Sequence, residues 1–260
     1  MTFLPSVVIP VFNHDSVISA RVDTVLALGL PCILVDDGSE PVCAAALTQL
    51  AAAHAGRVTL VRHARNRGKG AAVMSGISRA DELGYSHALQ IDADDQHAAG
   101  DIPAFLDLAR RHPAAIIAGQ PIFDESVPAA RLYFRYLTHI LVWIDTMSLD
   151  IRDSMCGFRV YPVAPVLALS RRVSLGNRMD FDSEILVRSW WEGTEIISHR
   201  TQVRYPRDGV SHFRMFRDNV FMTRMHIRLL LGMLVRSPRL ISRLVTRQAT
   251  RIAARDQTVQ

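Results

Sequence analysis

Short apolar runs alternate along the first half of the chain with longer stretches of helical periodicity. Residues 6–11, 32–35, 58–61 and 88–91 are apolar or β-branched and are bounded by turn residues, so we expect four strands. Residues 16–28, 41–53 and 71–83 lie between them and are expected to be helices. Strands that alternate with helices predict an α/β fold with a mostly parallel sheet covered on both faces.

The second half is less regular but continues the same domain. Helices are expected at 102–111, 129–146 and 180–191, and strands at 115–118 and, for the most part, 195–205. Residues 153–161 are expected to form a loop that enters a strand. No repeat or low-complexity linker interrupts the sequence, so one domain is predicted over residues 1–215, followed by a tail over 216–260.

The tail has its own pattern. Residues 219–235 are mostly apolar but are interrupted by Arg224, His226 and Arg228. Further arginines then recur every three to four residues and are expected to line one side of a helix: Arg236, Arg239, Arg243, Arg247, Arg251 and Arg255. Such a basic amphipathic helix binds an anionic membrane surface. The alternative is a helix packed on the domain with a solvated arginine face.

Composition narrows the class of protein. The 260 residues are 49% hydrophobic and carry a net charge of +5, and residues 200–260 hold 13 Arg against three Asp. This asymmetry indicates an anionic partner, but no aromatic residue is interleaved with the arginines from Arg236 to Arg255, which disfavours nucleic acid. The three cysteines show no metal or disulfide spacing, and neither a signal peptide nor a transmembrane run is evident. We therefore expect a protein of the cytoplasm, peripheral on the inner face of the membrane.

An acidic cluster follows the fourth strand. Asp92, Asp94 and Asp95 lie within four residues, followed by Gln96. Crowded carboxylates repel one another, and a bound cation removes that penalty. Asp92 and Asp94 are two residues apart and point the same way in extended chain, so they suit a hard cation such as Mg²⁺ or Mn²⁺. The alternative is a solvated acidic loop.

Two other strands also end in polar residues. Asp36 and Asp37 follow the second strand, and Gly68-Lys69-Gly70 follows the third and opens a helix. Ligands of open α/β sheets bind beyond the carboxyl ends of the strands, and a helix N-terminus favours an anion. Together these positions suit a nucleoside diphosphate with a cation on its diphosphate, although Asp36 and Asp37 also fit a simple turn cap.

These segments resemble the ordered motifs of family 2 glycosyltransferases. The resemblance rests on residues 8–13 (VIPVFN), 35–39 (VDDGS), 66–72 (NRGKGAA) and 92–97 (DADDQH). Residues 153–159 (DSMCGFR), 181–186 (FDSEIL) and 207–211 (RDGVS) point to the dolichol-phosphate mannosyltransferase-like, or polyprenyl-phosphate glycosyltransferase, branch. The resemblance implies a GT-A fold, here followed by a basic C-terminal helical tail where the branch often has membrane spans.

The resemblance also implies site residues. The donor, a UDP- or GDP-sugar, would be bound by Pro10, Phe12, Asn13, Asp36, Asp37, Gly68, Lys69, Asp92 and Asp94. Asp92 matches the residue that faces the sugar, Asp94 and Gln96 match metal ligands, and Asp36 matches the base-reading Asp. The acceptor would be contacted by Arg131, Arg207, Ser211 and His212, with Arg159 at the reacting groups. The family often has Lys or Arg where His212 stands.

The acceptor class is left open between a polyprenyl phosphate and a lipid hydroxyl. A phosphate is already anionic, whereas a hydroxyl needs a general base within hydrogen-bond reach. Asp153, Asp182 and Glu184 are the candidates. Their alternatives are structural: a turn cap for Asp153 and helix-face ion pairs for the other two.

The leading hypothesis is a metal-dependent inverting glycosyltransferase that acts on a lipid or lipid-linked acceptor at the membrane. A sugar-phosphate nucleotidyltransferase is one alternative, but the Gly-rich basic signature expected near its N-terminus is missing from residues 10–14. A non-catalytic nucleotide-sugar binding module is the other, and the full acidic set disfavours it. The sequence leaves open whether the protein is a homo-oligomer.

Overall fold

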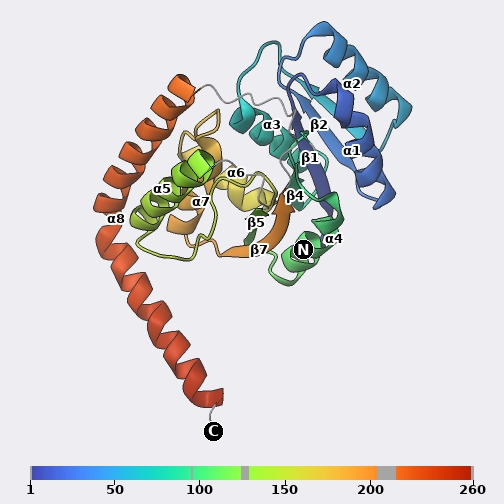
Figure 1. Ribbon diagram of the computed structural model, residues 1–260. Coiled ribbons are helices and arrows are strands. Elements are labelled where there is room, and N and C mark those ends of the chain that lie inside the picture. The colour runs from blue at the N-terminus through green and yellow to red at the C-terminus, as the bar shows by residue number, and fades with distance from the viewer. Residues whose placement is uncertain (1, 95, 124–128, 204–214, 259–260) are drawn as a thin grey trace.

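A computed structural model describes residues 2–94, 96–123, 129–203 and 215–258. It shows a seven-stranded mixed sheet between two layers of helices, with a long C-terminal helix along one side (Figure 1). The strands are β1 (Pro5–Val11), β2 (Cys32–Asp36), β3 (Val58–Arg62), β4 (His87–Gln90), β5 (Ile116–Phe123), β6 (Arg159–Pro162) and β7 (Ile196–Val203). The helices are α1 (Asp15–Ala27), α2 (Pro41–Ala53), α3 (Lys69–Glu82), α4 (Ile102–Arg111), α5 (Ala129–Thr146), α6 (Val163–Arg172), α7 (Phe181–Trp191) and α8 (Met215–Thr258), with a 3₁₀ turn at Ala99–Asp101.

The sheet order is β3-β2-β1-β4-β6-β5-β7. The first four strands in this order are parallel, β6 is antiparallel to both of its neighbours, and β7 is parallel to β5. The carboxyl ends of β1, β2 and β4 therefore share one edge with the beginning of β6. The predicted α/β class with a mostly parallel mixed sheet is confirmed.

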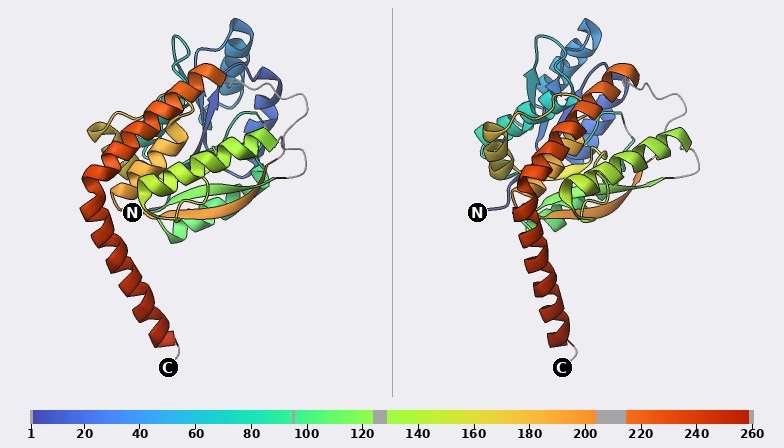
Figure 2. Two further views of the ribbon diagram at one scale, coloured as in Figure 1. Left: turned by 60° about the vertical axis from the view of Figure 1, so that its left-hand side comes forward. Right: turned by 90° about the vertical axis from the view of Figure 1, so that its left-hand side faces the viewer.

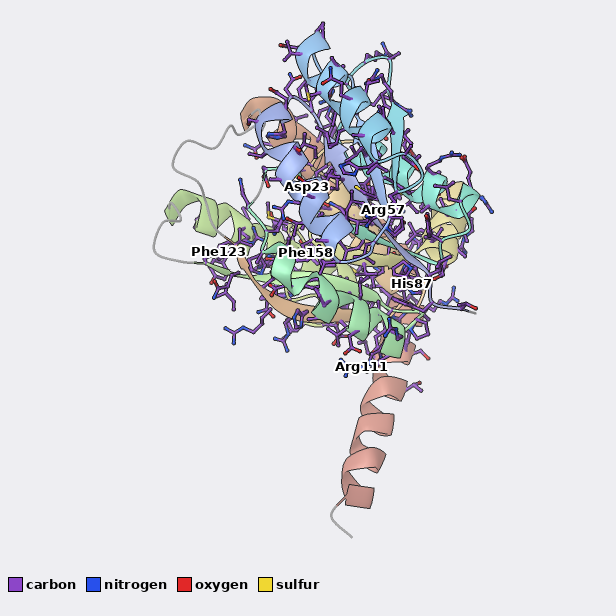
Figure 3. The ribbon with its side chains drawn as sticks, turned by 90° about the vertical axis from the view of Figure 1, so that its right-hand side faces the viewer. Asp23, Arg57, His87, Arg111, Phe123 and Phe158 are labelled. Atoms are coloured by element: carbon purple, nitrogen blue, oxygen red, sulfur yellow. The ribbon has the colours of Figure 1, made fainter. Side chains whose placement is uncertain are left out.

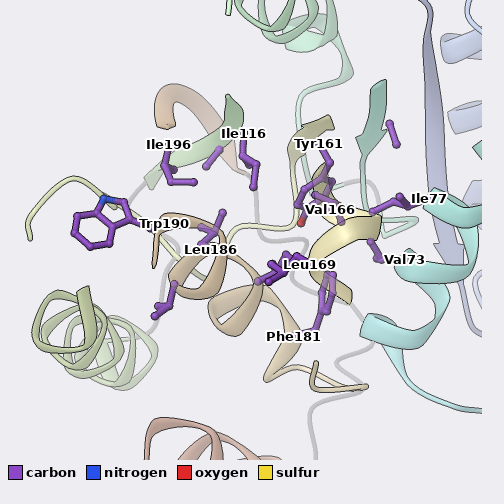
Figure 4. Close-up of a cluster of buried hydrophobic side chains, with 14 of the residues drawn as sticks. Val73, Ile77, Ile116, Tyr161, Val166, Leu169, Phe181, Leu186, Trp190 and Ile196 are labelled. Carbon is purple, nitrogen blue, oxygen red and sulfur yellow. The ribbon is translucent and has the colours of Figure 1, made fainter. Parts of the chain in front are cut away.

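Strand side chains alternate between two cores. On β1, Val8 belongs to the core under α3, α6 and α7, whereas Val7 and Ile9 belong to the core under α1, α2 and α4. Figure 4 shows the first core, with Tyr161 beside α6, and Figure 3 views the molecule from the α1 and α4 side. Both strand faces are covered, which is why these strands are apolar at nearly every position.

The sequence prediction missed α6, whereas the strand before it, β6, was expected as the strand that the 153–161 loop enters. The strand has only four residues, and α6 begins directly after Pro162, whose φ of −68° suits the first turn of a helix. Since no Gly, Asn or Asp marks a turn between them, the apolar run 158–169 gave no boundary signal.

The tail is one helix that continues through Pro238. Its inner side packs on the α7 core through Met225, Leu229, Met233 and Leu240, and its last part projects beyond the domain (Figure 2). No described helix combines the length and the apolarity that a membrane span requires.

Arginines of the predicted stripe contribute to this packing. The Arg243 guanidinium donates to the carbonyls of Trp190 and Trp191 at distances of 2.7 and 3.3 Å and lies 4.2 Å from the centre of the Trp190 ring. A cation at the C-terminal carbonyls of α7 is favoured by the helix dipole. Arg239 is exposed, and the side chains of Arg247, Arg251 and Arg255 lie outside the described set.

Candidate active site

A lysine joins the acidic cluster to a second carboxylate at the shared strand edge. The Lys69 ammonium, at the start of α3, lies 2.9 Å from Asp92 Oδ2 and 3.0 Å from Asp182 Oδ2. Asp92 follows β4, and Asp182 is the second residue of α7. Three segments that are far apart in sequence therefore meet at one half-buried cation.

The charges of this trio depend on each other. Burial opposes ionisation of Asp92, but the Lys69 ammonium overcomes that effect and holds the pKa of Asp92 well below its usual range. Burial likewise opposes the charge on Lys69, and Asp182 and Asp92 raise its pKa despite it. Asp92 Oδ1 is buried and, among the described residues, has no hydrogen-bond partner. That oxygen is thus left for a ligand.

Gly157 lets the chain pass close to this trio. A Cβ at Gly157 would collide with Asp92 Oδ2 and would lie 2.5 Å from Lys69 Nζ. The residue comes just before β6, which enters the sheet next to β4. Any side chain at this position would displace the carboxylate or the ammonium, which gives a physical reason for the glycine in the 153–159 motif.

Asp94 follows Asp92 by two residues, but nearby positive charges stabilise its ionised form less than they stabilise that of Asp92. Burial, and then the Asp92 charge, raise the pKa of Asp94 above its usual value. The Gln96 N–H donates to Asp94 Oδ1 at 3.2 Å, and Asp95 lies outside the described residues. No three described His, Cys, Asp or Glu side chains form a complete metal cluster. Two carboxylates fit Mg²⁺ or Mn²⁺ when phosphate oxygens complete the shell.

The β1 and β2 loops are held together beside the site. Asp36 Oδ1 accepts the Ser39 N–H at 2.8 Å, and Asp36 Oδ2 accepts Arg62 Nε–H at 2.8 Å. Asn13 has a φ of 56°, and its side-chain oxygen accepts the Glu40 N–H at 2.8 Å. The predicted donor residues Pro10 and Phe12 are half-buried on the same stretch as Asn13. Asp36 is thus a buried turn cap whose two oxygens each accept a hydrogen bond within the protein, and its predicted contact with the base stays a prediction.

Asp37 supports the Gly68 loop. Its Oδ1 accepts the Arg67 N–H at 2.9 Å, and its Oδ2 accepts the Gly68 N–H at 2.8 Å. Gly68 has a φ of 104°, which favours glycine, and a Cβ there would also collide with the Asn177 carbonyl oxygen. Asp37 therefore faces the loop backbone, and the loop delivers Lys69 to Asp92.

Asp153 is surrounded by donors. Arg135 of α5 binds it with two hydrogen bonds of 2.7 Å, and His139 Nε2 lies 3.2 Å from Asp153 Oδ2. The N–H groups of Met155 and Cys156 donate to Asp153 Oδ1. Burial favours the neutral acid, but His139 and Arg135 outweigh it and hold the pKa of Asp153 well below its usual range. The sequence did not predict that Arg135 and His139 contact Asp153. Their spacing of one helical turn on α5 is the only feature that could have indicated it.

Arg159 and Glu184 are both fully buried. The Arg159 guanidinium donates to the carbonyls of Ser154, Cys156 and Asp182. Glu184 accepts hydrogen bonds from the Gly176 N–H, from Arg188 and from Arg228 of α8. Arg159 thus fixes the 154–156 turn against α7, and Glu184 ties α8 to α7.

Several predicted acceptor residues cannot be placed. Arg131 belongs to α5, but its side chain lies outside the described set, and Arg207, Ser211 and His212 lie outside the described residues altogether. His97, the last residue of the 92–97 motif, lies with its Nε2 3.8 Å from Asp92 Oδ2. Of the predicted site residues, the structure thus brings Lys69, Asp92, Asp182 and Arg159 into contact, and their roles stay predictions.

An α/β sheet of this order, with a carboxylate cluster after β4 and converging β1, β2 and Gly68 loops, has the architecture of GT-A glycosyltransferases. The structure resembles glucosyl-3-phosphoglycerate synthase from Mycobacterium tuberculosis, solved with Mn²⁺, UDP-glucose and phosphoglyceric acid. The TM-score is 0.65 and the identity 15%, and the match covers 88% of this chain and 79% of that one.

Sequence comparison identifies the family. The family model for glycosyl transferase family 2 matches residues 6–175, so the chain belongs to that family and is a glycosyltransferase. It is 28% identical to dolichyl-phosphate beta-glucosyltransferase of Drosophila melanogaster, over 70% of this chain and 61% of the relative. It is 24% identical to UDP-N-acetylglucosamine–dolichyl-phosphate N-acetylglucosaminyltransferase of Methanococcus voltae, and that match covers 69% of this chain and 77% of the relative. The predicted family and its polyprenyl-phosphate branch are confirmed.

Proposed function

We propose that this protein is a metal-dependent inverting glycosyltransferase that moves a sugar from a nucleotide-sugar to a polyprenyl phosphate at the cytoplasmic face of a membrane. The observation that carries the proposal is the Asp92–Asp94 cluster with Lys69 at the edge where the β1, β2 and Gly68 loops meet. The named activities of the relatives, which transfer sugars to dolichyl phosphate, support it.

On the donor side, Asp36 accepts an N–H of the base, and the segment from Pro10 to Asn13 packs along the nucleoside. Asp92 faces the sugar, while Asp94 and Gln96 would hold a divalent cation. When bound, that cation neutralises charge on the departing diphosphate. Lys69 supplies a second positive charge next to Asp92, at 2.9 Å.

The acceptor side supports a phosphate over a hydroxyl. A hydroxyl acceptor needs a base that can take its proton. Asp153 is bound by Arg135 and His139, Asp182 by Lys69, and Glu184 by Arg188 and Arg228. Each carboxylate is thus already paired with a cationic side chain, and Asp153, whose pKa is held well below its usual range, is a weak base. An anionic phosphate attacks without losing a proton, so we assign these carboxylates to positioning.

This assignment predicts strong selection between two acceptors that differ only in their head group. Polyprenyl phosphate should be glycosylated at least about 10²-fold faster than the polyprenol of equal chain length, which is the size of a missing general base. Transfer is followed with radiolabelled donor, and NMR of the product gives the anomeric configuration, which should be opposite to that of the donor. Equal rates with the polyprenol would contradict the assignment.

Two neighbouring helices provide a surface for a membrane. On α8 the outward side is apolar where a helix on a soluble domain is usually polar, with exposed Ile227, Leu231, Leu234, Val235, Ile241 and Val245. On α5 the exposed side chains Tyr133, Tyr136, Leu137, Ile140 and Ile144 repeat with helical spacing. The two helices lie side by side (Figure 2). Arginines of α8, among them exposed Arg224 and Arg239, suit anionic head groups.

We therefore expect the protein to sediment with vesicles of phosphatidylglycerol and phosphatidylcholine. Leu231→Glu and Ile140→Glu should each weaken binding about tenfold or more, because each removes a large apolar side chain from the lipid contact. Val42→Glu is the matched control, since Val42 is 75% exposed on α2, on another part of the domain. Unchanged sedimentation of both variants would exclude this surface.

The donor is tested by thermal unfolding with UDP, GDP, CDP and dTDP, each with and without Mn²⁺. A ligand that binds only the folded state stabilises it by about 2.7 kcal/mol at a hundredfold excess over Kd. One nucleotide should raise the Tm, and only when Mn²⁺ is present. A shift of equal size without Mn²⁺ would contradict the metal dependence.

A further inference from the structure

A second polar cluster lies behind the Gly68 loop and is made by Asp37, His63 and Ser75. His63, which follows β3, has its Nδ1 2.7 Å from Asp37 Oδ1 and its Nε2 2.9 Å from Ser75 Oγ. Asp37 and His63 are buried, with 3% and 7% of their surface exposed. Ser75 belongs to α3, the helix that begins at Lys69.

The hydrogen bonds constrain where the ring of His63 carries its protons. An ionised carboxylate only accepts, so the proton between Asp37 and His63 belongs to His63 Nδ1. In the neutral ring, Nε2 then accepts the hydroxyl proton of Ser75. Both ring nitrogens are thus occupied, and the orientation of the imidazole is determined from both sides.

Asp37 connects His63 to the backbone of the Gly68 loop. Its two oxygens accept the Arg67 and Gly68 N–H groups, at 2.9 and 2.8 Å. Gly68 has a backbone conformation with positive φ, and the next residue is Lys69, whose ammonium contacts Asp92. A chain of four short contacts therefore runs from Ser75 through His63 and Asp37 to the backbone beside Lys69.

We propose that His63 is a positioning residue for the donor site. By fixing the Asp37 carboxylate, it holds the Gly68 loop in the conformation that presents Lys69 and the loop backbone to the nucleotide diphosphate. The inference rests on the proposed function only for the identity of the ligand, because the ordering of the loop is a property of the free protein. Loss of a group that orients a binding residue typically costs 10–100-fold in affinity.

Two substitutions separate positioning from packing. In His63→Asn the side-chain amide nitrogen lies near the former Nδ1 and can still donate to Asp37, but it does not reach Ser75. In His63→Gln the amide lies near the former Nε2, so the bond to Ser75 is retained and the bond to Asp37 is lost. Glutamine is closer to histidine in size, so if His63 acts through packing alone, His63→Gln should resemble the wild type more closely than His63→Asn does. If His63 acts by positioning Asp37, His63→Asn should resemble the wild type more closely.

The measurements are hydrogen exchange of the Arg67 and Gly68 amides by NMR, and the Kd for UDP or GDP with Mn²⁺ by calorimetry. We expect His63→Gln to accelerate exchange of both amides and to raise Kd by about 10–100-fold. His63→Asn should remain near the wild type in both. Ser75→Ala should change both in the same direction but less, with Ser78→Ala, one turn further along α3, as the control.

The outcomes are distinct. Wild-type protein that binds no nucleotide contradicts the proposed function, and the amide exchange still decides the role of His63. Wild-type binding together with unchanged exchange and Kd in His63→Gln overturns the inference, as does equal damage in His63→Asn and His63→Gln. Should His63→Gln fail to fold, Ser75→Ala decides by the same two measurements, and unchanged values there overturn the inference.

Discussion

Asp94→Ala is expected to lower kcat/KM by about 10²–10³-fold, the usual loss when one group that stabilises developing charge is removed. In the proposed site Asp94 holds the cation on the leaving diphosphate, so the Mn²⁺-dependent stabilisation by nucleotide should disappear as well. Transfer assays and thermal unfolding with nucleotide measure the two effects. Full activity in this variant would refute the proposed role of the cluster.

The same variant should fold at least as well as the wild type. Burial and the neighbouring Asp92 raise the pKa of Asp94, so ionised Asp94 lowers the free energy of unfolding of the free protein. The pKa of an aspartate in the unfolded chain is about 3.9. Between that pH and the raised pKa of Asp94, the folded state binds more protons than the unfolded state, so the free energy of unfolding falls as the pH rises. The Tm of Asp94→Ala relative to wild type should therefore increase with pH. Asp107→Ala, at a carboxylate that is 57% exposed, is the control and should show no such trend.

Lys69→Met is expected to lower the free energy of unfolding by about 3 kcal/mol, and the Tm by about 6–12 °C. Methionine retains the aliphatic volume but leaves Asp92 and Asp182 facing each other without the ammonium that lies 2.9 and 3.0 Å from them. Denaturant unfolding in the absence of metal measures the loss. Arg111→Met removes a cation whose side chain is 60% exposed and should change stability by less than about 1 kcal/mol.

The pH dependence distinguishes this mechanism from a loss of packing. In the wild type, Lys69 holds the pKa of Asp92 low. The contribution of ionised Asp92 to the free energy of unfolding is therefore fully present above about pH 4. It is lost only as the pH falls through the pKa that Asp92 has in the folded protein. Without the ammonium, burial opposes ionisation of Asp92 against His97 alone, so the pKa of Asp92 should be higher than in the wild type. The difference in the free energy of unfolding between the wild type and Lys69→Met should therefore become smaller as the pH is lowered from about 7 toward 5. A difference that does not change with pH would indicate packing alone.

The sequence alone determined the parallel half of the sheet and the edge that carries the donor site. Apolar period, turn residues and strand length are local properties, so β1 to β4, α4 and α5 were predicted within a few residues of their observed bounds. The positions of Asp36, the Gly68 loop and Asp92 at one edge followed from parallel connectivity. β6 and α6 gave no boundary because Pro162 joins a four-residue strand directly to a helix.

Only the tertiary structure decided which charges meet. Whether Asp153 acts as a base or as an anchor depends on Arg135 and His139, which α5 brings to it from outside its motif. Lys69 gained Asp182 as a partner only because α7 begins beside α3, and Arg243 contacts the end of α7 only because α8 folds back along the domain. A sequence pattern specifies each segment, but the pairing of charges between segments depends on how their apolar faces pack.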